Sequence, residues 1–394
     1  MKNLYIFTDS FLPIDNTTSY YLNGIVDALN DEKKFKINIY FIGNKPLPKI
    51  KKIKNINYRR IKYPKFNKNN LLLKNINFLL ISLIFSFISI IKVKKSETIL
   101  LTTNPPFMLL SISIIKKIKK FKTVLLVYDI FPENTIAANI IKKKSFFYKI
   151  LLKFFSISYD NMDYLIAIGR EMESYLGNKY GYQKVKFIPN WSNIDDIEYI
   201  NKNKLELQKE LSDKFIFQFA GNLGRVQELN LIFDAIKLVK NNKIVFLFIG
   251  DGVMKNKLIN LIQNNSNKNI IYLGRKEFNQ QNKFLPISDV GIVSLKKEVF
   301  MFGVPSKSYA YLAAGRPILF IGHNGSETGR MIDDNNIGWK TSTDSPDILA
   351  KLFDTISQKL NIEDKSIHVR KIAETVYSPK IIKENYISFL IDII

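Results

Sequence analysis

Three glycine-containing segments in the second half of the chain have the composition of a diphosphate-binding site. Their sequences are FAGNLGR at Phe219–Arg225, IGDG at Ile249–Gly252 and GVPSKSYAYLAAGRP at Gly303–Pro317. A glycine after a strand lets the backbone approach a ligand closely, and a helix that opens after Pro-Ser offers free N–H groups to a diphosphate. Each loop alone occurs in many α/β proteins, whereas their joint order and spacing predict one phosphate site.

Two cations in these segments are candidates to hold the anion. Lys307 falls in the first turn of the expected helix, and Arg225 follows the first glycine loop. Both can donate charge-assisted hydrogen bonds to phosphate oxygens. We therefore expect them near the bound diphosphate.

The composition excludes several other kinds of site. The 394 residues include no cysteine and two histidines, His323 and His368. A disulfide framework, a thiolate metal site and a cysteine nucleophile are therefore excluded, and a histidine-rich metal centre is not expected. The 46% hydrophobic and 24% charged residues are typical of a globular protein, and the length predicts two or three domains.

The elements that would position these loops alternate along the chain. Apolar strand-like runs such as NLYIFTD, TILLTT and TVLLVYDIF come first, and FIFQFAGN, KIVFLFIGDG and DVGIVSL follow residue 210. Longer periodic segments separate them, which predicts parallel sheets with helices on both faces. Two such series predict two Rossmann-like, doubly wound α/β domains whose strand ends face one another across a cleft. The segment Ile188–Ile200, rich in Pro, Asn and Asp, is the expected junction.

The motifs together resemble a known family. FAGNLGRVQEL, GDGVMKNKL, GVPSKSYAYLAAGRPI and SETGRMIDDNNIGW are similar to the donor-binding domain of family 4 glycosyltransferases, in the bacterial branch that builds O-antigen and capsule and includes fucosamine-type transferases. VYDIFPEN and TTNPPF resemble the acceptor-domain motifs of that branch. The resemblance covers nearly the whole chain. It implies a GT-B fold, a nucleotide-sugar donor, retention at the anomeric carbon, and neither a cofactor nor a bound metal. We expect the nucleotide to be UDP, and the chain also contains no Asp-x-Asp pair.

The same resemblance implies a domain division. Residues 1–190 would form the acceptor-binding, membrane-facing domain and residues 191–376 the donor-binding domain. Residues 377–394 would form a helix that crosses back onto the first domain. The acceptor implied is a polyprenyl-diphosphate-linked saccharide or another surface polysaccharide.

Residues around the donor can be assigned from the matching motifs. The glycine loops would border the phosphates and the nucleotide, Arg275 would lie near the base, and the PSK segment would hold the diphosphate and stabilise the departing nucleoside diphosphate. The donor-binding residues expected are Gly221, Asn222, Arg225, Gly250, Asp251, Gly252, Arg275, Pro305, Ser306, Lys307 and Glu327. Glu327 can also be read as a neighbour of a helix N-cap.

Two carboxylates are candidates on the acceptor side. Asp129 and Glu133, in YDIFPEN, follow a predicted strand, where they could face the cleft. With Lys307 they form the expected catalytic set. One carboxylate could accept the proton of the acceptor hydroxyl as general base, or could orient the acceptor while the donor phosphate takes that proton. A turn cap for Asp129 and a solvated charge at a helix start for Glu133 are the alternatives.

The sequence departs from the family pattern at positions that matter for the sugar. Many members have two glutamates eight residues apart around this helix, and here Phe302 and Ala310 occupy those positions. Neither side chain can accept a hydrogen bond from a hydroxyl. The Arg and Lys that are common in the first glycine loop fall on Asn222 and Gln227. A catalytically inactive paralogue or partner of a transferase is therefore an alternative.

Charge and hydropathy favour a membrane partner. Of the net charge of +24, residues 1–190 carry +20, with 32 Lys and Arg against 12 Asp and Glu. The longest apolar run, Phe78–Ile91, spans about 21 Å as a helix, which is too short for the hydrocarbon core, and Lys92, Lys94 and Lys95 follow it. Apolar surface beside lysines attracts an anionic leaflet. We expect a cytoplasmic protein, peripheral on the inner face of the cell membrane; a buried helix and a compositional excess of lysine are the alternatives.

Two further function classes are alternatives to the transferase. A sugar-nucleotide epimerase can share the two-domain architecture, but its chemistry needs several acids and a histidine. A nucleic-acid-binding protein would show arginine-rich contacts and aromatic residues interleaved with basic ones. Only eight arginines occur, four of them in or beside the glycine motifs, so no nucleic-acid partner is expected.

Overall fold

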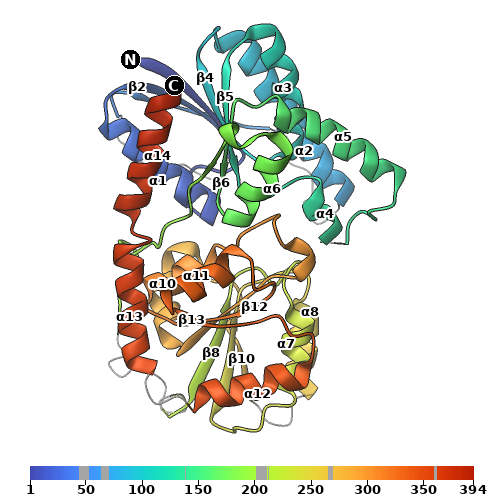
Figure 1. The fold of residues 1–394 in the computed structure, drawn as a ribbon, viewed down its shortest axis with the longest axis vertical. Helices are drawn as coiled ribbons and strands as arrows, with labels where there is room; N and C mark the ends of the chain where they lie inside the picture. Colours follow the sequence, from blue (N-terminus) through green and yellow to red (C-terminus); the bar gives the residue numbers. More distant parts are fainter. Residues whose placement is uncertain are drawn as a thin grey trace.

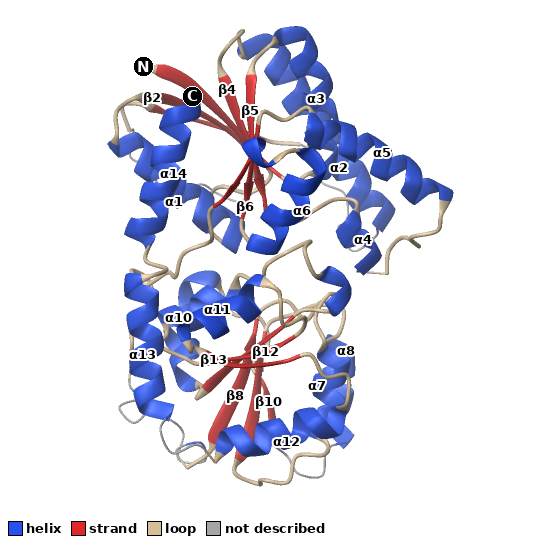
Figure 2. Ribbon diagram, in the orientation of Figure 1, coloured by secondary structure: helices blue, strands red, loops and turns tan. Residues whose placement is uncertain are grey.

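The computed structural model describes residues 1–43, 53–63, 71–137, 139–200, 211, 213–264, 269–358 and 362–394. Within these residues the strands form two fully parallel sheets, one built from the first half of the chain and one from the second. Helices cover both faces of each sheet (Figure 2). The prediction of two Rossmann-like, doubly wound domains is therefore confirmed.

The first sheet has seven strands in the order β3-β2-β1-β4-β5-β6-β7. Its strands are β1 (Lys2–Thr8), β2 (Phe35–Ile42), β3 (Ile56–Ile61), β4 (Thr98–Thr102), β5 (Lys122–Val127), β6 (Tyr164–Ala167) and β7 (Val185–Phe187). Its helices are α1 (Thr17–Asp31), α2 (Leu71–Lys92), α3 (Pro106–Lys119), α4 (Glu133–Ala137), α5 (Phe146–Asp160) and α6 (Arg170–Tyr180). The order changes direction beside β1 and β4, and that reversal opens a crevice at the carboxyl ends of the strands.

The second sheet has six strands in the order β10-β9-β8-β11-β12-β13. Its strands are β8 (Phe215–Ala220), β9 (Ile244–Ile249), β10 (Ile270–Tyr272), β11 (Val290–Ser294), β12 (Ile318–Ile321) and β13 (Gly338–Thr341). Its main helices are α7 (Leu229–Ile236), α8 (Lys255–Asn264), α9 (Gln281–Phe284), α10 (Lys307–Ala313), α11 (Glu327–Asn335), α12 (Pro346–Ser357) and α13 (Ile362–Thr375). The predicted glycine loops follow β8 and β9, and the PSK segment leads into α10.

Continuous apolar runs explain why these strands lie inside. Every residue of β4 and of β9 is buried, as expected when helices cover both faces of a parallel sheet. Each sheet separates two apolar clusters, one on each face. The strands are therefore packed on both sides, and the loops at their carboxyl ends are the parts left to form a site.

The chain ends with a helix that returns to the first domain. After α13, which lies on the second domain, α14 (Pro379–Ile393) packs against α1 (Figure 1). Tyr386 of α14 contacts the buried Trp191 edge-on, and Lys122 Nζ donates a hydrogen bond of 3.0 Å to the Ile393 carbonyl. The predicted crossing back of the terminal helix is confirmed.

Helix α2 is longer than the apolar run suggested. It begins at Leu71, has 22 residues and spans about 33 Å. The sequence-based argument that this segment is too short for a bilayer is therefore wrong, because Asn75–Lys92 is long and apolar enough to cross one. Only 33% of that stretch is buried, but Phe85 stacks on Phe7 of β1 and Ile81 is 3% exposed. One face of α2 therefore belongs to the core of the first domain.

Candidate functional site

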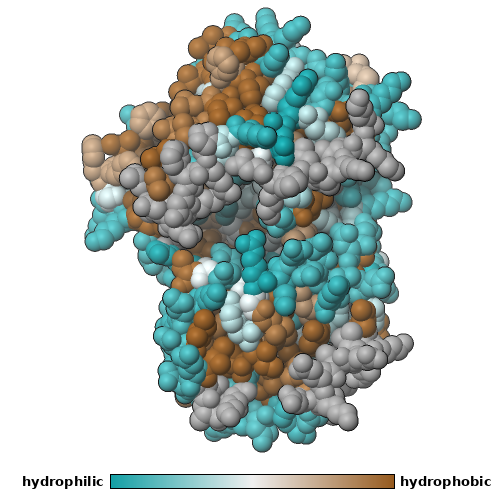
Figure 3. All heavy atoms as spheres, turned by 180° about the vertical axis from the view of Figure 1, so that it is seen from behind, coloured by the Kyte–Doolittle hydropathy of each residue, from teal (hydrophilic) through white to brown (hydrophobic). Residues whose placement is uncertain are grey.

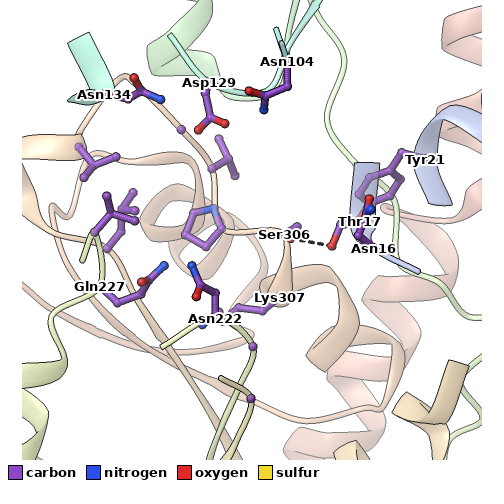
Figure 4. Close-up of a pocket in the computed structure, with 18 of the residues that line it drawn as sticks. Asn16, Thr17, Tyr21, Asn104, Asp129, Asn134, Asn222, Gln227, Ser306 and Lys307 are labelled. Carbon is purple, nitrogen blue, oxygen red and sulfur yellow. Dashed lines mark hydrogen bonds between the residues drawn. The ribbon is translucent and has the colours of Figure 1, made fainter. Parts of the chain in front are cut away.

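The carboxyl ends of the two sheets face a shared cavity of about 960 Å³. The loops after β1, β4 and β5 line it from the first domain, and the loops after β8, β9 and β10 and the start of α10 line it from the second (Figure 4). Parallel sheets place their functional loops at this edge. The cavity is therefore the place where a donor and an acceptor could meet.

Two glycines let the first two loops of the second domain cross at close range. The N–H of Gly221 donates to the Ile249 carbonyl at 2.8 Å. A Cβ at Gly250, whose φ is +138°, would lie 1.8 Å from the Gly221 carbonyl oxygen. No side chain fits there, so these glycines bring bare backbone to the cavity wall, as a phosphate site requires.

Lys307 is a buried cation of the cavity wall whose pKa is strongly lowered. Its Nζ is buried and has no hydrogen-bond partner within the described part of the chain. The ammonium lies 3.5 Å from the centre of the Phe219 ring, and Gly221 leaves room beside it. Desolvation lowers the pKa of Lys307 to about 7. A buried cation aimed at a cavity without a counter-ion is suited to an anionic ligand.

The structure brings most of the predicted donor-binding residues to this cavity. Those that line it are Gly221, Asn222, Gly250, Asp251, Arg275, Pro305, Ser306 and Lys307. Ser306 Oγ also lies 3.5 Å from Thr17 Oγ1 of α1, so the PSK segment touches the first domain. Figure 4 shows Lys307 and Asn222 on the same side of the cavity.

Three predicted donor-binding residues do not line the cavity. They are Arg225, Gly252 and Glu327. Arg225 is exposed outside it. A Cβ at Gly252 would lie 2.4 Å from the Leu223 carbonyl oxygen, so close packing of the two loops explains why this position is glycine.

Glu327 joins the two domains. Its carboxylate, 2% exposed, accepts hydrogen bonds from the backbone N–H and the Nε of Arg170, each at 3.0 Å. Arg170 also contacts Asp334 at 2.7 Å. In the opposite direction, the N–H of Glu327 donates to Glu171 Oε1 at 2.9 Å, and burial raises the pKa of Glu171 to about 7. Each glutamate therefore caps the first turn of the other domain's helix, α6 or α11.

Asp129 lies at the boundary between the domains and lines the cavity. It forms a β-bridge with Gly303, and the next N–H, of Ile130, donates to the Phe302 carbonyl at 3.1 Å. The Asp129 N–H donates to Thr103 Oγ1 at 3.3 Å. Burial raises the pKa of the Asp129 carboxyl to about 6. A carboxylate with such a pKa is suited to accept a proton near neutral pH.

Glu133 is not brought together with Asp129. Its side chain is buried beside α6, where it accepts hydrogen bonds from Tyr175 Oη at 2.5 Å and Lys179 Nζ at 3.2 Å. It is not among the residues that line the cavity. The structure therefore gives Glu133 a packing role at the start of α4.

Several cavity residues were not predicted from the sequence. Asn104, Asn134 and Tyr21 line the cavity from the first domain, and Figure 4 shows the two asparagines on either side of Asp129. Asn104 belongs to the TTNPPF motif that follows β4, and this strand-end position could have identified it. Asn134 is the last residue of the VYDIFPEN motif, which could likewise have identified it, whereas Tyr21 lies within a helical pattern that carries no such signal.

The positions of the two missing glutamates have different surroundings. Ala310 lines the cavity and is 9% exposed, so a longer side chain at this position would extend into the cavity. Phe302 packs edge-on against Tyr175, with ring centroids 5.5 Å apart, and so belongs to the domain contact. No cluster of three or more metal-ligating side chains occurs among the described residues.

Comparisons with known proteins agree with this architecture. Residues 201–367 match the family model described as glycosyl transferases group 1. The chain is 31% identical over 389 residues, 98% of its length and 97% of the relative's, to the "Probable glycosyltransferase WbjE" of Pseudomonas aeruginosa.

Solved structures show the same fold at low sequence identity. HepE of Anabaena, solved in complex with UDP-glucose, has a TM-score of 0.71 and 14% identity, with all of both chains covered. WaaG, a glycosyltransferase involved in lipopolysaccharide biosynthesis, has a TM-score of 0.66 and 11% identity, covering 97% of this chain and 99% of the other. The predicted GT-B fold is confirmed, and the chain belongs to the group 1 glycosyltransferases.

Proposed function

We propose that this protein transfers a sugar, with retention and without a metal ion, from a UDP-sugar to a polyprenyl-diphosphate-linked acceptor in surface-polysaccharide assembly. The observation that carries the proposal is the buried, unpartnered Nζ of Lys307, beside the backbone crossing of Gly221 and Gly250. The relative HepE, solved with UDP-glucose, supports the choice of donor. The O-antigen and fucosamine-type assignments remain predictions.

Lys307 and Ser306 would act on the leaving group. Negative charge grows on the diphosphate as the bond to the sugar breaks, and an ammonium already in place stabilises that charge without reorganising water. Because a diphosphate favours the protonated lysine, donor binding should raise the depressed pKa of Lys307. Asn222, Asp251 and Arg275 line the same cavity and would contact the rest of the donor.

Asp129 would act on the acceptor. It is the one of the two predicted carboxylates that lines the cavity, and its raised pKa suits proton transfer. Asn104 and Asn134 flank it in Figure 4 and could hydrogen-bond to acceptor hydroxyls. We therefore assign general-base or acceptor-orienting chemistry to Asp129 and none to Glu133.

The first domain would also bind the membrane. Its helices α2 and α3 expose apolar side chains. Figure 3 shows brown surface over this domain as well as over the second. The exposed residues on α2 are Leu79, Leu83, Phe87, Ile90 and Ile91, and those on α3 are Ile114 and Ile118. Because the opposite face of α2 packs into the domain core, we propose that α2 lies along the inner leaflet rather than across it. In this arrangement residues 1–190 face the membrane, residues 191–376 hold the donor and residues 377–394 tie the two domains together.

The alternatives predict other outcomes. Among the described residues neither histidine lines the cavity, which disfavours an epimerase. An inactive paralogue would bind UDP and transfer nothing, and the absence of glutamates at Phe302 and Ala310 is the feature that favours it.

The test is sugar transfer into lipid. The full chain would be incubated with radiolabelled UDP-sugars and a lipid extract from polysaccharide-producing bacteria, and label in the organic phase would be counted. We expect transfer from one UDP-sugar. Asp129→Asn should lower the transfer rate by about 10²-fold or more, whereas Glu133→Gln should keep the rate of wild type. Binding of UDP without any labelled lipid would contradict transfer and support the inactive paralogue.

A further inference from the structure

The cavity has an apolar arm that the nucleotide-sugar does not need. Where it faces α2, α3 and α5, it is lined by Phe78, Phe107, Ile141, Phe147, Leu151 and Phe155. These side chains offer no hydrogen-bonding group, whereas a sugar or a diphosphate requires several. The nearby polar lining on this side comes from Asn75, Asn134 and Thr135.

The arm opens onto the outside of the first domain. Phe147 and Ile140 both line the cavity and are also exposed to solvent, by 59% and 45%. The neighbouring Phe146 is 79% exposed. The mouth is therefore an aromatic edge that continues the cavity outward. Helix α5 contacts α3, and α3 contacts α2, so this mouth adjoins the apolar surface assigned above to the membrane.

Cations surround the same mouth. Lys142, Lys143 and Lys144 precede Phe146 and are exposed, and Lys149 is exposed one turn along α5. Lysines beside an apolar opening complement the phosphates of an anionic lipid surface. The basic rim would therefore face the head groups of the leaflet, while the apolar arm behind it fits a long aliphatic chain.

We propose that this arm holds the first isoprene units of the acceptor's lipid chain, with the linked saccharide directed toward Asp129. The inference rests on the proposed function and adds a lipid-binding subsite to it. The aliphatic chain replaces water against the aromatic lining, and the chain leaves at Phe147 into the leaflet. The enzyme would therefore recognise the lipid directly as well as the sugar.

Binding of geranylgeranyl diphosphate tests this subsite. Titration of the full chain, with saturating UDP to occupy the donor site and with the lipid below its critical micelle concentration, would be followed by calorimetry. Inorganic diphosphate is the probe for the head group alone. The variant is Phe147→Ser, and the matched control is Phe154→Ser, which removes an equally exposed phenylalanine (56%) from the same helix outside the cavity.

We expect wild type and Phe154→Ser to bind the lipid diphosphate equally, and Phe147→Ser to bind about tenfold more weakly, with Phe147→Leu restoring most of the affinity. Inorganic diphosphate should bind all of them weakly and alike. Equal losses in the two serine variants, or binding of inorganic diphosphate as tight as that of the lipid, would overturn the inference. Thermal unfolding with UDP is run in parallel. A UDP shift without lipid binding refutes the subsite alone, whereas no UDP shift refutes the proposed function.

Discussion

Replacing Lys307 by methionine should stabilise the ligand-free protein near neutral pH. The ammonium is enclosed and has no hydrogen-bond partner among the described residues, so only the contact with the Phe219 ring offsets its removal from water on folding. Methionine has a similar length and no charge, and can lie against the same Phe219 ring. Lys307 therefore destabilises the ligand-free protein, and an anionic ligand would offset that cost.

The expected magnitude follows from the lowered pKa. Burial takes the pKa of Lys307 from 10.5 to about 7, and each unit corresponds to about 1.36 kcal/mol, so the upper limit is about 5 kcal/mol below pH 7. Water that enters the cavity reduces this figure. Because the folded pKa lies below the unfolded one, the unfolded chain binds more protons between pH 7 and 10.5. The stability of wild type should therefore rise relative to the variant across that window, by about 2 kcal/mol from pH 7 to 9.

The assay is urea unfolding of both proteins at pH 6, 7, 8 and 9. Lys276→Met, which removes an exposed ammonium from the rim of the same cavity, is the control and should follow the pH dependence of wild type. The difference between wild type and Lys307→Met should be largest at pH 6 and 7 and shrink at pH 9. Parallel curves for the two proteins at all pH values would show that the Lys307 ammonium is solvated and would refute the reasoning.

Substitutions at Gly250 and Arg170 and the pH dependence set by Asp129 test three further parts of the structure. Gly250→Ala should cost at least about 2 kcal/mol of stability and abolish UDP binding. The control Gly274→Ala, with φ +68° and nothing within 4 Å of the added Cβ, should cost about 1 kcal/mol and leave UDP binding intact. Chemical denaturation measures the stabilities and calorimetry the UDP binding. Arg170→Met should destabilise the protein by about 3 kcal/mol in urea unfolding, because the buried Glu327 carboxylate loses its cation. An unchanged urea midpoint would argue against this domain contact. If Asp129 is the general base, the transfer rate should fall about tenfold per unit as pH drops below about 6, where the carboxylate becomes protonated, and a flat profile down to pH 5 would remove it from that role.

The sequence was sufficient for the architecture and for most of the donor side. Continuous apolar strands and glycine-containing strand ends are local signals, and Gly221, Gly250 and Lys307 lie in one cavity because parallel strands end at the same edge. The length of α2 was underestimated, because its first turns are less apolar than the run that begins at Phe78.

The sequence was insufficient where two distant segments meet. Glu327 pairs with Arg170, which is 157 residues away in the sequence, and no local pattern indicates that pairing. Asp129 and Glu133 are four residues apart, but α4 begins at Glu133 and directs that side chain toward α6 instead of the cavity. Helix direction, rather than residue type, separates these two carboxylates.

Thermal unfolding of the purified protein with UDP, GDP and CMP tests the central claim most directly. A ligand present at 100 times its dissociation constant should add about 2.7 kcal/mol of stability. We predict an upward shift in Tm with UDP, none with GDP or CMP, and loss of the UDP shift in Lys307→Ala. No shift with any nucleotide, or a UDP shift that Lys307→Ala leaves intact, would contradict a donor site built on Lys307.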